Sequence, residues 1–381
     1  MMRNKMICRM LTVMTAASMT AAALGGSAVF AQETAETTEA AETTEAAETT
    51  EAAEAAETTE TTGAADITAS CSLFSVSVPA EILEIADIEC TNDSIAFYEK
   101  QSHEKFGGFV GAISLYKSLS DYGDMPSYRR GGVVEFADGT TMDVVLACPS
   151  DVQVDMENEE SVANYGTIND AMNEIIASIT PVDGTYIPQD QVDTTGIYDE
   201  ILAKLAADVR DLKDYEGLAD DNFSYVYAYT YDNPEVEIGY AFTDINQDGY
   251  DELVIGLVGG SVFYDMFVPV DGEPAQIFSG GERNCGTLVG HGDGFQEICI
   301  QASGGAALGS ITFYVLPSNR AEVTEQVSFV IDGDKDADNP YFIDYTFGEP
   351  EQVTEEEWNS RMDNFGDTVE IEFTPLLSTQ D

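Results

Sequence analysis

One short segment, "GYAFTDINQDGYDELVIG" from Gly239 to Gly256, constrains the fold of this chain more than any other. Apolar residues enter and leave the segment in runs that are typical of two strands joined by a loop. Within the loop, oxygen-bearing side chains recur at every second position, and Gly249 stands where the chain must turn sharply. The segment therefore predicts an acidic, tightly turned loop between two strands.

The spacing of these oxygens predicts a calcium site. Calcium takes six to eight oxygen ligands, and a wrapping loop offers side chains at positions 1, 3 and 5, a carbonyl at position 7 and another group at position 9. Those positions hold Asp244, Asn246, Asp248, the carbonyl of Tyr250, and Glu252. We expect Ca²⁺ as the cofactor, in a structural role that holds the two flanking strands together. The alternative is a solvated acidic turn without an ion.

The loop resembles the D-x-[DN]-x-D-G-x-x-[DE] loops of FG-GAP and integrin-type propeller repeats, in which an apolar strand such as "LVIG" follows. It differs from an EF-hand because strands flank it, and from a dockerin loop because position 12 is Ile255 and not a carboxylate. A propeller would repeat the loop blade by blade, so a single mostly-β domain is expected. Together with "VTEEEWNSRMDNF", the loop also resembles secreted modules of Gram-positive bacteria with no assigned function.

The first 31 residues have the pattern of an export signal. Three basic residues, ending at Arg9, precede an apolar run from Met10 to Ala23, and "GGSAVFA" offers short side chains for cleavage. The run is too short and too often interrupted for a membrane anchor. We expect a secreted or extracellular protein, with association with the cell envelope as a variant of this location, and no membrane span after signal cleavage.

The rest of the chain predicts an α+β organisation in four parts. Residues 32–69 are expected to be a disordered spacer, because 33–62 contain only Ala, Thr and Glu and offer nothing large to bury. Residues 70–181 are expected to form an antiparallel sheet with a packed helix, and 182–195 a linker. Residues 196–381 are expected to form a mostly-β domain with N- and C-terminal helices that carries the calcium loop.

Several local patterns support this organisation. Asp138-Gly139 between two alternating apolar runs predicts a hairpin turn. Apolar residues at helical spacing predict helices over 162–179 and 196–212, and Thr354 with Glu357 forms a capping box for a further helix that Gly366 closes. In "NFSYVYAYTYD" the aromatics alternate, which predicts a strand with a row of tyrosines on one face, either packed in the core or binding glycan or peptide.

Charge and cysteine content limit the classes of partner and site. The chain has 71 acidic and 15 basic residues and a net charge of -56, which excludes nucleic acid and anionic membrane surfaces as partners. Five cysteines remain after signal cleavage, so a fully paired disulfide framework is excluded. Cys285 and Cys299 are either a disulfide or two thiols on neighbouring strands. No C-x-x-C spacing supports zinc or thioredoxin-like chemistry.

Little in the sequence indicates catalysis. The two histidines, His103 and His291, lie in polar or glycine-rich contexts typical of the surface, and no hydrolase or nucleotide-binding motif is present. The alternating acids from Asp332 to Asp338 are either a charged surface loop or a second ion site. We therefore expect a non-catalytic exported protein that binds an extracellular protein or glycan. A secreted hydrolase using carboxylates is the first alternative, and a solute- or envelope-binding component the second.

Overall fold

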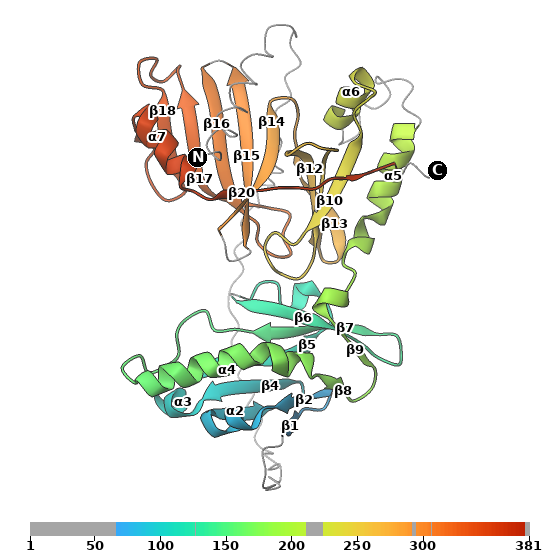
Figure 1. Ribbon diagram of the computed structural model, residues 1–381, viewed down its shortest axis with the longest axis vertical. Helices are drawn as coiled ribbons and strands as arrows, with labels where there is room; N and C mark the ends of the chain where they lie inside the picture. Colours follow the sequence, from blue (N-terminus) through green and yellow to red (C-terminus); the bar gives the residue numbers. More distant parts are fainter. Residues whose placement is uncertain (1–65, 126, 211–223, 292–294, 306, 378–381) are drawn as a thin grey trace, which may run out of the picture. The chain divides into compact units, whose positions relative to one another are not determined.

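The computed structural model describes residues 66–125, 127–210, 224–291, 295–305 and 307–377. The predicted export signal and almost all of the predicted spacer lie outside these residues. The described chain is rich in antiparallel β-structure, with fewer helices (Figure 1). It forms two compact units that are discontinuous in sequence. Unit 1 contains the described residues of 112–150 and 183–381, and unit 2 contains those of 66–111 and 151–182.

Unit 2 combines short strands with three helices. Its strands are β1 (Ile67–Ser70), β2 (Phe74–Val78), β3 (Ala86–Cys90), β4 (Ser94–Glu99) and β8 (Thr180–Pro181), and its helices are α2 (Ala80–Ile85), α3 (Lys100–Phe106) and α4 (Glu159–Ala177). The first strand begins inside the predicted spacer and pairs antiparallel with β2. Helix α4 packs on β2 and β4 and buries Ile168, Met172 and Ile175, which confirms the predicted helix.

Unit 1 contains a small antiparallel sheet in the order β5-β7-β6-β9. Its strands are β5 (Phe109–Tyr116), which begins in unit 2, β6 (Tyr128–Glu135), β7 (Thr141–Ala147) and β9 (Thr185–Pro188), with short 3-10 helices η1 (Leu119–Asp121) and η2 (Gln189–Gln191). The predicted hairpin turn is confirmed, since Gly139 adopts φ 84 and Phe136 N donates to Thr140 O at 2.8 Å. Within the predicted linker, β9 pairs with β6.

A larger, twelve-stranded antiparallel sheet makes up most of unit 1. Its strands are β10 (Ile238–Thr243), β11 (Glu252–Leu257), β12 (Phe263–Val270), β13 (Glu273–Ser279), β14 (Asn284–Gly290), β15 (Gln296–Gly305), β16 (Leu308–Val315), β17 (Thr324–Asp332), β18 (Tyr341–Tyr345), β19 (Glu351–Gln352), β20 (Asp367–Val369) and β21 (Thr374–Pro375). The order is β19-β18-β17-β16-β15-β14-β12-β11-β10-β21, with β13 on β12 and β20 on β14. The two strands predicted to flank the acidic loop are β10 and β11.

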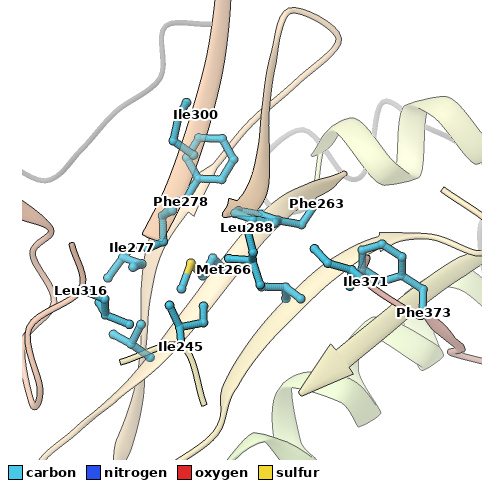
Figure 2. Packing of buried hydrophobic residues seen from close by; sticks show 13 residues of the cluster. Ile245, Phe263, Met266, Ile277, Phe278, Leu288, Ile300, Leu316, Ile371 and Phe373 are labelled. Atoms are coloured by element: carbon cyan, nitrogen blue, oxygen red, sulfur yellow. The ribbon is translucent and has the colours of Figure 1, made fainter. Parts of the chain in front are cut away.

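Three helices of unit 1 cover parts of this sheet: α5 (Asp199–Arg210), which follows the 3-10 helix η3 (Thr195–Tyr198), α6 (Ser224–Asp232) and α7 (Glu355–Asp363). Strand β11 is buried on both faces, which explains its continuous apolar run. Leu253 and Ile255 pack with residues of α5 and α6, whereas Val254 belongs to a second core cluster. Phe263 and Met266 of that cluster are seen in Figure 2. The predicted metal loop thus leads into β11, a strand that is almost entirely buried.

The tyrosine-rich segment is a helix, so the predicted strand is wrong. Alternation of tyrosines suggested period two, but helix α6 places Tyr225 and Tyr229 one turn apart, with ring centroids separated by 5.9 Å. Val226 and Tyr227 are fully buried in the core with α5. Phe223 lies outside the described residues. Tyr227 therefore serves packing on this side of the sheet, whereas Tyr229 and Tyr231 are exposed, and tertiary burial overrides the local alternation.

Helix α7 begins as predicted and ends earlier. Thr354 is the N-cap, and its hydroxyl accepts a hydrogen bond from Glu357 N at 3.2 Å. The helix ends at Asp363 with Asn364 as the C-cap, so Phe365 and Gly366 lie beyond it. Trp358 is buried against Phe329 with a ring-centroid distance of 5.7 Å. The cap fixes where the helix starts and therefore where Trp358 enters the core.

Thr354→Ala is expected to lower the free energy of unfolding by about 1 kcal/mol, because an orphan amide of the first turn loses its acceptor. Ser360→Ala is the matched control, since Ser360 is exposed on the same helix and its removal should change stability by less than about 0.5 kcal/mol. Urea unfolding of both variants measures the difference. Equal stability of the two variants would contradict the capping role.

A buried carboxyl group lies on β12 of the large sheet, outside the predicted metal loop. Asp265 on β12 is 1% exposed and accepts a hydrogen bond from Gln276 Nε2 at 3.0 Å. Burial raises its pKa to about 8, against the smaller lowering effect of hydrogen bonds from Ser279 and Gln276. The folded chain therefore holds a proton here at neutral pH that the unfolded chain releases near pH 4.

Because the folded pKa of Asp265 is raised, its contribution to stability is fully present below about pH 4 and is lost as the pH rises to about 8. Asp265→Asn removes this titration. The variant is expected to gain roughly 2–5 kcal/mol relative to the wild type between pH 5 and pH 9. Urea unfolding of both proteins at the two pH values tests this, and a difference that does not change with pH would refute it.

Candidate metal centre

The predicted metal loop joins β10 to β11. The two strands pair antiparallel, and Thr243 lies opposite Glu252, so the two ends of the loop meet. Two loop residues have left-handed backbone, Gln247 at φ 59 and Gly249 at φ 88. A Cβ at Gly249 would also lie 2.7 Å from the Cβ of Arg130. Glycine is thus required there both for the turn and for the close approach of a side chain from β6.

The loop's own side chains build its turns. Asp244 accepts hydrogen bonds from the amides of Asp248, at 3.1 Å, and Gly249, at 3.0 Å. Asn246 Oδ1 accepts from Asp248 N at 3.1 Å, and Asp248 Oδ1 accepts from Tyr250 N at 2.9 Å. These contacts draw the side chains at positions 1, 3 and 5 to the inside of the loop, which is where ligands to a central cation must lie.

Glu252 supplies the most informative oxygen atom. Its side chain is fully buried, and Oε2 accepts a hydrogen bond from Ile245 N at 2.8 Å. Its other oxygen, Oε1, is buried without a hydrogen-bond partner. An ionised carboxylate oxygen without a partner is costly in the interior of a protein, and such atoms call for an explanation such as a bound ion.

Three carboxyl groups of the loop share this environment. Burial, and then the charge of Asp248, raises the pKa of Asp244 to about 7. Burial also raises the pKa of Asp248, while burial and the charge of Asp248 raise that of Glu252 well above its usual value. The three groups therefore repel one another when ionised. A divalent cation among them would remove both the repulsion and the cost of burial.

The donor set fits calcium. No group of three or more His, Cys, Asp or Glu side chains in the described part of the chain is arranged as a metal-ligating cluster. The three carboxylates of the predicted set, Asp244, Asp248 and Glu252, are therefore not gathered into such a cluster here, and its other two oxygens are the Asn246 amide and the Tyr250 carbonyl. Hard carbonyl, amide and carboxylate oxygens are calcium ligands, and the partnerless Oε1 of Glu252 is a free carboxylate acceptor.

Several residues around the loop were not predicted from the sequence. Arg130 and Gln189 donate hydrogen bonds to the carbonyl of Gly249. Thr194 donates to Asp251 Oδ2 at 2.5 Å, and Tyr198 donates to the Asp251 carbonyl at 2.9 Å. These contacts span between 53 and 119 residues along the chain, so no local pattern could indicate them.

The second acidic run forms ordinary turns. Asp332 Oδ1 accepts from the amides of Asp334 and Lys335, and Asp336 Oδ1 accepts from the amide of Asp338 at 2.9 Å. Gln352 Nε2 donates to Asp336 Oδ2 at 2.9 Å. Asp332 and Asp336 are thus used as turn acceptors, which favours the surface-loop interpretation over a second ion site.

The histidines and cysteines fall in separate places. His103 lies on α3, with its Nδ1 3.0 Å from Asp87 Oδ2, and His291 Nε2 lies 2.9 Å from Glu297 Oε2.

All five described cysteines are free thiols. On the paired strands β14 and β15, Cys285 lies opposite Gln301 and Cys299 lies opposite Thr287, so the two thiols are diagonal neighbours. The structure therefore has two free thiols at Cys285 and Cys299 and no disulfide between them.

No helix in the described residues is long and apolar enough to cross a membrane. Comparison with known proteins returned no match for this chain among family models, curated proteins or solved structures.

Proposed function

We propose that this chain is an exported, non-catalytic protein whose C-terminal part is stabilised by one structural Ca²⁺ ion and which binds an extracellular protein or glycan. In this proposal Asp244, Asn246, Asp248, Tyr250 and Glu252 hold the ion. The N-terminal α+β part and the calcium-loop part would follow a cleaved signal and a spacer. The observation that carries the calcium site is the buried, partnerless Oε1 of Glu252, in a loop that also holds the buried Asp248 and the half-buried Asp244.

The ion would supply positive charge and nothing else. Asp244 and Asp248 shape the loop from its first half, and Glu252 anchors it at the start of β11. Binding at both ends of the loop would hold the β10–β11 pair closed where the loop begins. Export is supported by the leader pattern in the first 31 residues, and the partner class by the excess of acidic residues, which disfavours polyanions.

Isothermal titration calorimetry of the full chain, stripped of metal with EDTA, tests the site. We expect one calcium ion per chain and a rise in melting temperature. At free calcium about 100 times the dissociation constant, the ion adds about 2.7 kcal/mol to the free energy of unfolding. Magnesium should bind more weakly, because it demands near-ideal octahedral geometry and gives up water reluctantly. No binding heat and an unchanged melting temperature would overturn the proposal.

A further inference from the structure

One peptide group of the loop is held from both sides. The carbonyl of Gly249 accepts a hydrogen bond from Gln189 Nε2 at 2.6 Å and another from Arg130 Nη1 at 3.1 Å. The N–H of the same peptide, that of Tyr250, donates to Asp248 Oδ1 at 2.9 Å. Two groups from elsewhere in unit 1 therefore fix the peptide that joins the sixth and seventh positions of the loop.

The two outside donors also support each other. Arg130 Nη1 donates to Gln189 Oε1 at 3.0 Å, so the amide of Gln189 is oriented with its nitrogen toward the loop. The guanidinium carbon of Arg130 lies 4.2 Å from the centroid of the Tyr250 ring. The hydroxyl of Tyr250 in turn donates to Asp143 Oδ2 at 2.8 Å. The carbonyl of Gly249, at position 6, and the amide and ring of Tyr250, at position 7, are thus all restrained.

Restraint of this peptide matters for a cation in the loop. The carbonyl of Gly249 is engaged by two donors, which leaves the next carbonyl, that of Tyr250, as the main-chain oxygen for position 7. Fixing the peptide before binding lowers the ordering cost that binding must otherwise meet. Neither Gln189 nor Arg130 would contact the ion, so their effect would act through the loop backbone.

We propose that Gln189 and Arg130 are positioning residues that set the calcium affinity of the loop, and that calcium in turn stabilises the segments that carry them, which are β6 for Arg130 and β9 with the adjoining η2 for Gln189. The inference rests on the calcium site proposed above. Because coupling between two parts of a protein is reciprocal, a loop that binds calcium better with these donors in place must also hold β6 and β9 more firmly when calcium is bound.

Gln189→Leu tests the inference, because it removes the donor without leaving a buried charge. Gln191→Leu is the matched control, since Gln191 lies on the same 3-10 helix η2 and is exposed. Calorimetry with calcium alone as the titrant is expected to give binding about 5- to 100-fold weaker in Gln189→Leu and unchanged in Gln191→Leu. The dissociation constant of the folded chain does not change with global stability, so a purely structural role would leave it unaltered.

Hydrogen exchange of the full wild-type chain, with calcium and with EDTA, supplies the second measurement. Calcium is expected to slow exchange of the β6 and β9 amides, and this slowing should be smaller in Gln189→Leu. If the wild type binds calcium but the variant binds it equally well and β6 exchanges at the same rate in both conditions, the inference is wrong and the site stands. If the wild type binds no calcium, the calcium site itself fails and the inference falls with it.

Discussion

Glu252→Gln is expected to abolish the calcium-dependent rise in melting temperature while making the metal-free protein more stable. The amide keeps an oxygen that can accept from Ile245 N, as Oε2 does now at 2.8 Å. The substitution replaces a buried carboxyl group whose pKa is raised by burial and by the charge of Asp248. Without metal, the change relieves the repulsion between Glu252 and the other loop carboxylates, which stabilises the folded protein. With calcium, it removes a charged ligand, which should weaken binding on the order of 100-fold or more.

The opposite signs make this variant more informative than a simple loss of stability. Melting temperatures of wild type and Glu252→Gln are measured in EDTA and in saturating calcium, and calorimetry gives the dissociation constants. Glu273→Gln is the control, because Glu273 begins β13 and is exposed, and both of its melting temperatures should match the wild type. An unchanged calcium affinity in Glu252→Gln would show that Glu252 is not a ligand.

Arg130→Met is expected to lower the free energy of unfolding by about 3–5 kcal/mol even without calcium. Arg130 Nη2 lies 2.7 Å from Asp143 Oδ1, and the two side chains are 3% and 6% exposed. The other carboxylate oxygen accepts from the hydroxyls of Tyr122 and Tyr250 at 2.9 and 2.8 Å. Removing the arginine leaves the carboxylate of Asp143 buried without its counter-charge, and two tyrosine hydroxyls do not replace it.

Urea unfolding in EDTA measures this effect free of any contribution from calcium. Arg129→Met is the matched control, because Arg129 lies next to Arg130 on β6 and is exposed. This substitution should change the free energy of unfolding by less than about 0.5 kcal/mol. Adding Asp143→Asn to Arg130→Met should recover part of the loss, since the neutral amide no longer needs a counter-charge and still accepts from the tyrosines. A loss below about 0.5 kcal/mol in Arg130→Met would contradict the buried-pair argument.

Local patterns predicted many elements of this chain because their information lies within a few residues. Alternating apolar runs predicted the strands on either side of the acidic loop, Asp138-Gly139 predicted a hairpin turn, and Thr354 predicted the start of α7. For the tyrosine-rich segment, the same kind of local pattern predicted the wrong structure. Its residues alternate as a strand would, yet burial of Val226 and Tyr227 against α5 makes it a helix.

For the candidate site, the sequence by itself determined which oxygens the loop offers, because their spacing and Gly249 are properties of nine consecutive residues from Asp244 to Glu252. Only the tertiary structure decided how those oxygens are surrounded. It left Glu252 Oε1 buried without a partner and brought Gln189 and Arg130 onto the Gly249 carbonyl from 60 and 119 residues away. Burial and long-range donors depend on how distant strands pack, and that information is absent from any short segment of sequence.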